Sequence, residues 1–99
     1  MSEGATPQDR VLLLSLSDLS PVRRLAMART LVGLGTAEQV RTARREFRDL
    51  DNVMFVIGDR TDIPWHDGWF SLIVDPAGGE ATPAMLRALA GDGRIATTV

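Results

Sequence analysis

The sequence contains no cysteine. Disulfide bonds, thiolate metal sites and cysteine nucleophiles are therefore excluded, and stability must come from the packing of side chains. Lysine is also absent, because all 11 Lys and Arg positions are arginine, so a catalytic lysine or a Schiff base is excluded. The single histidine, His66, provides neither a histidine metal cluster nor a second imidazole for acid–base chemistry.

Several catalytic and membrane signatures are missing as well. The sequence has no Gly-x-Ser-x-Gly elbow of serine hydrolases, no Gly-x-Gly-x-x-Gly dinucleotide fingerprint and no phosphate-loop lysine. No apolar run approaches the roughly 20 residues that cross a bilayer. Met1–Gln8 has neither a basic start nor an apolar core, so we expect a cytoplasmic protein that makes no membrane contact.

The composition of the sequence indicates one small globular domain. The 99 residues are 44% hydrophobic and 24% charged, a balance that allows one buried core in water. We expect residues 1–9 to form a flexible tail and residues 10–99 to form the domain. The net charge of −2 argues against general nucleic-acid binding, although eight of the 11 arginines fall in the first 50 residues.

Short apolar runs alternate with helical patterns along the chain. Val11–Leu16 is nearly continuous in apolar residues, which is typical of a strand that helices cover on both faces. Similar runs recur later in the sequence. The pattern predicts strands at Val11–Leu16, Thr30–Gly35, Asn52–Gly58, Phe70–Asp75 and Gly93–Val99.

Three helices are expected between these strands. In the first, Ser20 is the N-cap, Pro21 takes the first helical position and the helix runs to about Arg29. In the last, Thr82 is the N-cap and Pro83 takes the first helical position. The residues expected to face inward in that helix, and the glycine expected to end it, are Met85, Leu86, Leu89 and Gly91.

The middle helix is opened by Thr36 and Gln39, which have the spacing of a capping box. One of its faces carries four arginines, at Arg41, Arg44, Arg45 and Arg48. Such a face could contact phosphate, since arginine pairs bidentately with phosphate oxygens. We favour a solvated face instead, because Glu38–Arg41 and Arg45–Asp49 have the spacing of surface ion pairs.

Strands that alternate with helices predict an α/β fold, Rossmann-like, with a doubly wound, mostly parallel five-stranded sheet and helices on both faces. In such sheets, ligands bind beyond the carboxyl ends of the strands. The residues expected at those ends are the candidate site residues, namely Ser15, Ser17, Asp18, Gly35, Asp59 and Asp75.

The second half of the chain resembles the class I S-adenosylmethionine-dependent methyltransferase family. The family's run of Gly-Asp, Leu-Pro-Phe, a hydrophobic strand and Arg-x-Leu-x-Pro-Gly-Gly-Arg is matched in order. The matching segments are Gly58-Asp59, Ile63–Trp65, Asp67-Gly68, Leu72–Val74 and Arg87–Ile95. The first half matches more loosely at Leu31–Leu34 and Ala43-Arg44. The resemblance covers roughly Val11 to Ile95 and implies a methyltransferase-like core.

The departures from the family concern the cofactor. The family's Gly-x-Gly-x-Gly loop lets backbone approach the cofactor closely, but Ser15, Ser17 and Leu19 stand at those positions here. Gly35 replaces the acid that binds both ribose hydroxyls. Only Asp59, at the family's adenine-binding position, is retained. The resemblance therefore implies a pseudoenzyme with no catalytic residue and no bound metal, for which S-adenosylmethionine is the one possible cofactor.

Two hypotheses follow. In the first, the domain is non-catalytic and acts in assembly or regulation. The family continues past strand five into an antiparallel hairpin, whereas this sequence stops, so strand five is expected at a bare edge. Pairing there would make a homodimer or join another protein.

In the second hypothesis, the chain is a minimal methyltransferase that binds S-adenosylmethionine through a rebuilt loop. That loop would be Ser15–Asp18, with Asp59 as a further contact. Methyl transfer needs mainly proximity and orientation of two substrates, so few catalytic side chains are required. A plainer interpretation competes with it, because Asp59 is also ordinary turn chemistry and Ser15 and Ser17 can bond to nearby backbone.

Overall fold

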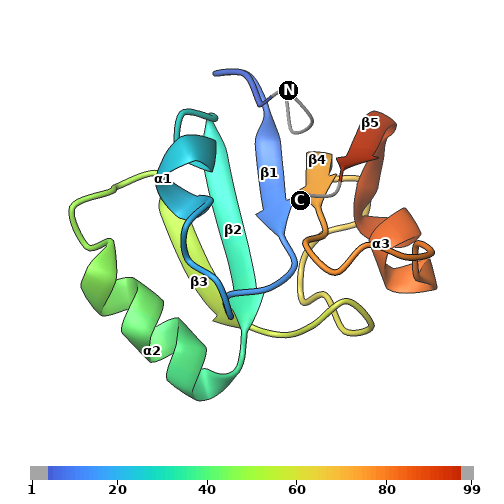
Figure 1. Cartoon of the computed structure of the whole chain (residues 1–99). Coiled ribbons are helices and arrows are strands. Elements are labelled where there is room, and N and C mark those ends of the chain that lie inside the picture. Colours follow the sequence, from blue (N-terminus) through green and yellow to red (C-terminus); the bar gives the residue numbers. More distant parts are fainter. Residues whose placement is uncertain (1–4, 97–99) are drawn as a thin grey trace.

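Five strands form one sheet in the order β3-β2-β1-β4-β5, and every strand pair is parallel (Figure 1). The computed structural model describes residues 5–96. The chain order reverses between β1 and β4, as in a doubly wound fold, and the predicted fold class is confirmed. The strands are β1 (Arg10–Leu13), β2 (Thr30–Gly35), β3 (Val53–Ile57), β4 (Phe70–Val74) and β5 (Leu89–Ala96).

The central position of β1 in the sheet explains its apolar sequence. It pairs with β2 on one side and with β4 on the other. Val11, Leu12 and Leu13 have no exposed surface, because alternate side chains enter the cores on the two faces of the sheet. A strand buried on both faces has no need for polar residues, which accounts for the continuous apolar run.

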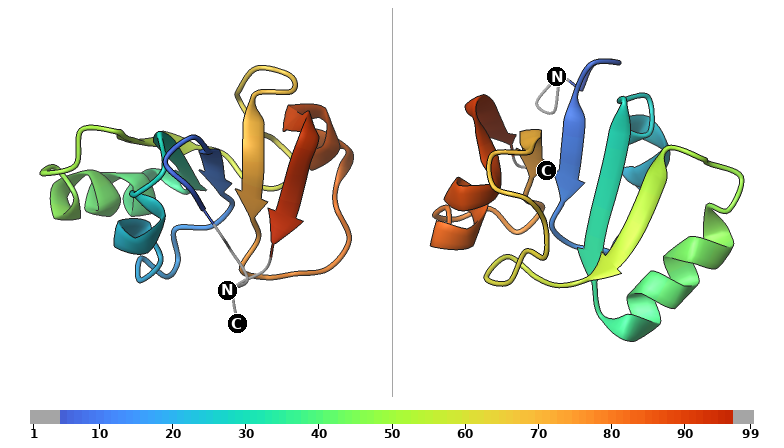
Figure 2. Two further views of the ribbon diagram at one scale, coloured as in Figure 1. Left: turned by 90° about the horizontal axis from the view of Figure 1, so that it is seen from above. Right: turned by 180° about the vertical axis from the view of Figure 1, so that it is seen from behind.

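Helices cover both faces of the sheet. Helices α1 (Val22–Leu25) and α2 (Ala37–Glu46) pack on one face, and α3 (Pro83–Ala88) packs on the other together with Ile63 from the long connection after β3. Figure 2 shows α1 and α2 near β1 to β3, and α3 beside β4 and β5. Within residues 5–96, no helix has the length and hydropathy of a membrane span.

The first helix is shorter than predicted. Helix α1 has four residues, its N-cap position is Pro21 with no side-chain cap, and Ser20 bonds to Asp18 instead. The Asn52 side-chain amide donates to the carbonyls of Ala26 and Ala28, both at 2.8 Å. The extension predicted to Arg29 is wrong because a distant side chain binds the carbonyls after Leu25.

The middle helix begins as predicted. The Gln39 backbone N–H donates to Thr36 Oγ1 at 3.2 Å, and Gln39 Oε1 accepts from the Thr36 N–H at 3.0 Å. This reciprocal pair is the expected capping box. Val40, Ala43 and Phe47 bury the apolar face of α2 against the sheet.

The last helix begins as predicted but ends early. Thr82 caps it and Met85 is fully buried, whereas Leu86 is 59% exposed and Leu89 already belongs to β5. A helix of six residues turns only one narrow face to the core, so residues three apart, Met85 and Ala88, are buried. The inward positions predicted for Leu86 and for a helical Leu89 are wrong, as is the end at Gly91. Of the predicted fifth strand, residues 97–99 lie outside the described residues.

Asp9 ties the start of β1 to β4 and β5. It is buried within the segment predicted to be a tail. Ser71 Oγ donates to its Oδ1 at 2.7 Å, and Arg94 Nη2 and the Thr6 N–H donate to its Oδ2 at 3.2 and 2.8 Å. Burial by itself raises the pKa of Asp9, but these donors and the charge of Arg94 together lower it from 3.8 to about 2.

Protonation of Asp9 in acid is therefore expected to destabilise the fold. Because its folded pKa lies below the unfolded value, the carboxylate stabilises the fold above about pH 4 and this contribution is lost as pH falls toward 2. The contribution is about 2 kcal/mol. Urea unfolding of the wild type and Asp9→Asn across this range measures it. Their difference in unfolding free energy should shrink on acidification, and a constant difference would contradict this account.

Candidate functional site

A hollow of about 360 Å³ lies beyond the carboxyl ends of β1, β2 and β3. Three of the six predicted site residues lie there, one at the carboxyl end of each strand, namely Ser15, Gly35 and Asp59. Its apolar walls come from Leu14, Leu34 and Ile57. The remaining lining residues are Ser15, Gly35, Thr36, Gln39, Gly58, Asp59 and Asp62. This is the position at which parallel doubly wound sheets bind ligands.

The loop after β1 is closed by its own side chains. Ser15 Oγ and Ser17 Oγ lie 2.8 Å apart, and the Ser17 N–H donates to Ser15 Oγ at 3.2 Å. Strand β1 therefore ends at Leu13, short of the predicted Leu16. Among the described residues no side-chain-bearing residue has a positive φ, so this loop lacks the left-handed backbone that glycines would allow.

Ser17 and Asp18 lie outside this hollow. Ser17 lines a neighbouring hollow of about 380 Å³ between the β1 loop and the start of α2. Asp18 is exposed and accepts hydrogen bonds from the Ser20 N–H at 3.0 Å and from Ser20 Oγ at 3.1 Å. These bonds lower the pKa of Asp18. Its carboxylate thus serves the turn that leads into α1.

Gly35 ends β2 beneath the side chain of Gln39. A Cβ atom added at Gly35 would lie 2.7 Å from Gln39 Oε1 and 3.1 Å from the Cβ atoms of Gln39 and Leu16. The same Gln39 oxygen accepts the Thr36 N–H in the capping box. A larger residue at position 35, including an acid, would therefore require the Gln39 side chain to move.

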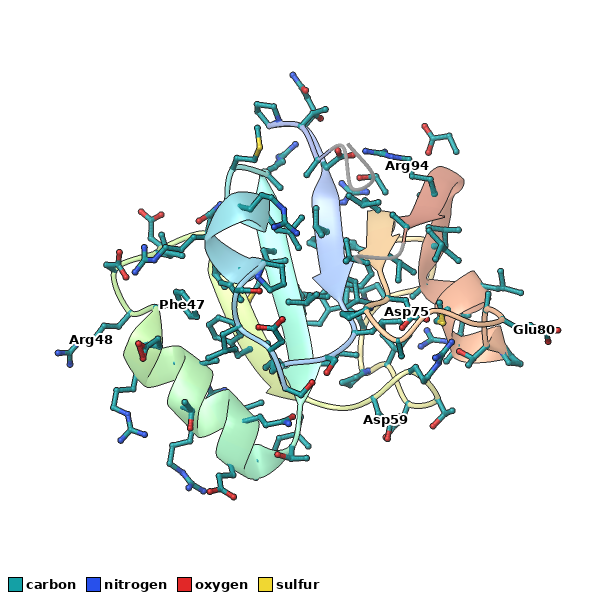
Figure 3. All side chains as sticks on the ribbon, viewed as in Figure 1. Phe47, Arg48, Asp59, Asp75, Glu80 and Arg94 are labelled. Carbon is teal, nitrogen blue, oxygen red and sulfur yellow. The ribbon has the colours of Figure 1, made fainter. Side chains whose placement is uncertain are left out.

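Asp59 lies at the same end of the sheet and is exposed (Figure 3). Its Oδ1 accepts from the Thr61 N–H at 2.8 Å and from Thr61 Oγ1 at 2.7 Å. The backbones of Asp59 and Asp62 also bond to each other, which closes a tight turn. The bonds from Thr61 lower the pKa of Asp59, so the carboxylate is charged at neutral pH.

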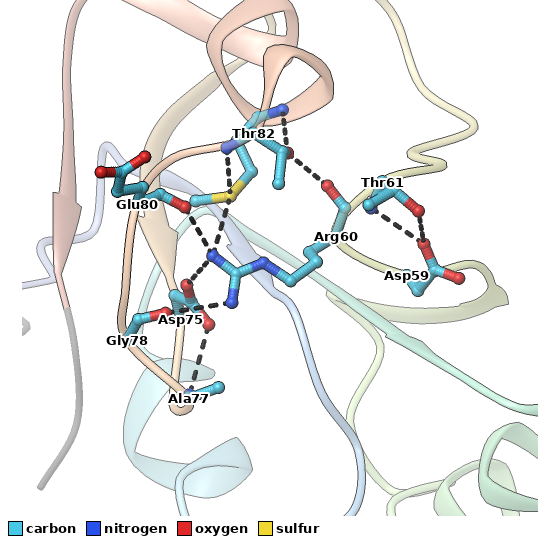
Figure 4. Close-up of polar contacts among 9 residues, drawn as sticks. Asp59, Arg60, Thr61, Asp75, Ala77, Gly78, Glu80 and Thr82 are labelled. Atoms are coloured by element: carbon cyan, nitrogen blue, oxygen red, sulfur yellow. Dashed lines mark hydrogen bonds and ion pairs between the residues drawn. The ribbon is translucent and has the colours of Figure 1, made fainter.

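Asp75 is buried after β4 and is paired with Arg60 rather than open to the hollow (Figure 4). Its Oδ2 lies 2.9 Å from Arg60 Nη2, outside hydrogen-bond geometry, and its Oδ1 accepts from the Ala77 N–H at 3.2 Å. Arg60 also donates to the carbonyls of Gly78 at 3.0 Å and Glu80 at 2.8 Å. The guanidinium therefore fastens the β4–α3 loop over this end of β4.

Arg60 is the residue that sequence reasoning missed. It is the only arginine between Arg48 and Arg87, within a turn-rich segment, and no motif distinguishes it. Thr82 Oγ1 donates to the Arg60 carbonyl, so its backbone also holds the start of α3. Among the described residues, no group of three or more acids, histidines or cysteines could hold a metal ion.

Neither protein-family models nor curated proteins match this chain, but solved structures do. Geranyl diphosphate methyltransferase in complex with SAM matches over 97% of this chain, with a TM-score of 0.79 and 18% identity. A SAM-dependent methyltransferase from Aquifex aeolicus matches over 95%, with a TM-score of 0.79 and 15% identity. A complex of the Haloferax volcanii Trm112 methyltransferase activator with a proposed methyltransferase matches over 94%, with a TM-score of 0.78 and 21% identity.

The chain has the class I methyltransferase fold. The resemblance that the second half of the sequence suggested is thus matched in three dimensions across nearly the whole chain. This chain spans about half of the solved methyltransferases, namely 44%, 57% and 46% of the three above. The TM-scores establish the methyltransferase fold. At identities this low, the activity has to be argued from the site.

Proposed function

We propose that this methyltransferase-fold domain acts in assembly or regulation, as a homodimer or as the partner of another protein, and does not itself catalyse methyl transfer. The observation that carries the proposal is the position of Gln39 above Gly35. In the family, an acid at this point binds the ribose hydroxyls. Here the capping box of α2 uses that space, so the ribose contact is replaced by a structural one.

The fit of S-adenosylmethionine to the remaining residues is incomplete. The Ser15–Ser17 pair replaces the glycines that let backbone approach the cofactor. Asp75, at the end of β4, is held by Arg60 and does not line the hollow. The site keeps an apolar hollow with two exposed carboxylates, Asp59 and Asp62. We therefore derive no reaction step through this cofactor.

Association through β5 belongs to the same proposal. Strand β5 is the last strand of the described sheet, and an edge strand offers backbone groups to another strand. The Haloferax volcanii protein, which was solved with an activator, supports the idea that this fold takes protein partners. Light scattering that gives a monodisperse monomer, together with no partner in a pull-down from the source, would count against the proposal.

One observation favours the alternative, a minimal S-adenosylmethionine-dependent methyltransferase. Ser15, Gly35 and Asp59 come from three separate strands and line one hollow of about 360 Å³. That volume lies within the range of small-molecule sites. In this alternative, Asp59 would accept a hydrogen bond from the adenine amino group through the part of its carboxylate not used by Thr61.

Calorimetric titration with S-adenosylhomocysteine separates the two functions. Our proposal predicts no saturable heat up to about 1 mM ligand, because two of the three cofactor contacts are missing. The alternative predicts saturable binding that Asp59→Ala weakens about tenfold or more, by loss of one charge-assisted hydrogen bond. The matched control is Asp92→Ala, which removes an exposed carboxylate on β5. Tight binding that only Asp59→Ala abolishes would overturn the non-catalytic assignment.

A further inference from the structure

Strand β3 and helix α2 form a surface at the edge of the sheet opposite to β5. Strand β3 is the other terminal strand of the described sheet, and α2 packs beside it (Figure 1). Two adjoining hollows, of about 350 and 490 Å³, run between them and share Arg44 and Val56. We refer to these two hollows as the α2–β3 groove.

The groove has an apolar floor with unusual exposure. Met54 is 44% exposed and Ile57 is 63% exposed, and both line the groove together with Val56. The sequence predicted this strand as part of a sheet with covered faces. In the structure Phe55 packs into the core on the face that carries α2, whereas Ile57 on that face and Met54 on the other face are exposed. Exposed apolar side chains on both faces of a terminal strand mark it as an interaction site.

The rim of the groove is purely basic. Arg41, Arg44 and Arg48 line it, and no acidic residue does. The ion pair expected between Arg45 and Asp49 is absent, because Asp49 pairs with Arg23 at 3.1 Å.

Of the rim arginines, Arg41 and Arg48 make no hydrogen bond or ion pair with another residue among positions 5–96. The expected Glu38–Arg41 pair is likewise absent. The rim therefore presents uncompensated positive charge, and Figure 3 shows Arg48 projecting away from the domain.

The free edge of β3 presents backbone groups to the same groove. The Leu31 N–H donates to the Asn52 carbonyl and the Gly58 N–H donates to the Gly35 carbonyl, so even-numbered residues of this segment face β2. Val53, Phe55 and Ile57 therefore direct their backbone groups outward. Arg44 Nη2 donates to the Phe55 carbonyl at 3.0 Å, which covers the middle of the edge.

We propose that the α2–β3 groove binds an extended segment of a partner protein in which acidic and apolar residues alternate. The segment pairs with the edge of β3. Its apolar side chains cover Met54 and Val56 on the face away from α2, and its carboxylates bind Arg41 and Arg48 on the α2 face. A carboxylate also draws Arg44 away from the Phe55 carbonyl, which frees the edge for strand pairing. This inference concerns a surface separate from β5 and from the hollow, and it holds whether or not a cofactor binds.

Two other occupants fit less well. A second copy that pairs edge to edge through β3 about a two-fold axis would bring two identical arginine rows together. A nucleic acid would gain the charge contacts, but the domain is acidic overall and the exposed floor is aliphatic, with no aromatic side chain exposed for base stacking. Alternating acid and aliphatic residues match both the rim and the floor.

The test uses a fluorescent probe peptide of about eight residues with alternating aspartate and valine, which is long enough to pair along β3. We expect saturable binding by fluorescence anisotropy, with amide shifts centred on Val53, Phe55 and Ile57 in two-dimensional NMR spectra. Arg41→Ala combined with Arg48→Ala should weaken binding about tenfold or more. The matched control is Arg45→Ala, which removes an exposed arginine of α2 outside the groove and should change affinity less than twofold.

Comparison peptides make the result decisive. A lysine–valine peptide should fail because of the basic rim, and an aspartate–serine peptide should bind at least tenfold more weakly because it cannot cover the apolar floor. Circular dichroism verifies that each variant is folded. Absence of shifts on β3 at millimolar peptide, or equal binding by the double variant, would overturn the proposal. So would light scattering that shows a dimer broken by Ile57→Asp, which would assign the groove to a second copy.

Discussion

Arg60→Ala is expected to lower the free energy of unfolding by about 3 kcal/mol. The substitution leaves the Asp75 carboxylate, only 4% exposed in its side chain, without its cation. It also removes the donors to the Gly78 and Glu80 carbonyls in the β4–α3 loop. An uncompensated buried charge costs far more than a lost surface ion pair. Urea unfolding measures the effect.

A double-mutant cycle assigns this loss to the pair. In an Asp75→Asn background no charge is left unpaired, so Arg60→Ala should cost about 1 kcal/mol, and the coupling energy should be about 2 kcal/mol. Arg23→Ala is a useful control, because its bond to Asp49 joins two side chains that are each 59% exposed. It should cost less than about 1 kcal/mol. Equal losses at Arg60 and Arg23 would contradict the role of Arg60 as the clamp of the loop.

Met85→Ala and Leu86→Ala should differ sharply although they are neighbours in α3. Met85 has no exposed surface and lies in the core with Phe70 and Ile73, so its truncation is expected to cost about 2 to 4 kcal/mol. Leu86 is 59% exposed, and its truncation should cost less than about 0.5 kcal/mol. Thermal or urea unfolding of the two variants gives the comparison.

The conservative variant Met85→Leu separates packing from the sulfur contacts of this residue. The Thr82 N–H lies 3.4 Å from Met85 Sδ, and Arg60 Nη2 lies 3.9 Å from it. Leucine keeps most of the volume, so a loss under about 1.5 kcal/mol would assign the effect of Met85→Ala to the cavity. If Leu86→Ala proved as costly as Met85→Ala, the orientation of α3 described above would be wrong.

The methyltransferase fold of this chain depends on residues other than the candidate site residues. The fold depends on apolar runs such as Val11–Leu13, which enter two cores and tolerate many substitutions. The candidate site depends on a few positions at the strand ends, such as Ser15 and Gly35. This explains how TM-scores near 0.79 coexist with identities below 20% in geranyl diphosphate methyltransferase and the Aquifex aeolicus enzyme.

Local sequence determined the succession of strands and helices along the chain and the starts of two of the three helices. The bounds of β2 agree with the prediction, and the capping box at Thr36 and the N-cap at Thr82 were each predicted from two residues. These features depend on neighbours within a few positions, so pattern alone is sufficient. The same holds for the meeting of Ser15, Gly35 and Asp59, since the carboxyl ends of parallel strands share one edge.

Tertiary structure alone decided which polar groups are free. The Asn52 side chain binds the Ala26 carbonyl at the end of α1 from 26 residues away. Arg60 binds Asp75, and Asp49 pairs with Arg23 instead of Arg45. None of these partners can be derived from spacing, because an arginine or an amide side chain bonds to whatever the folded chain brings within reach. The sequence by itself therefore determined the methyltransferase-like sheet and the edge that carries the candidate site, whereas the contacts around that site and the open α2–β3 groove are set by long-range packing.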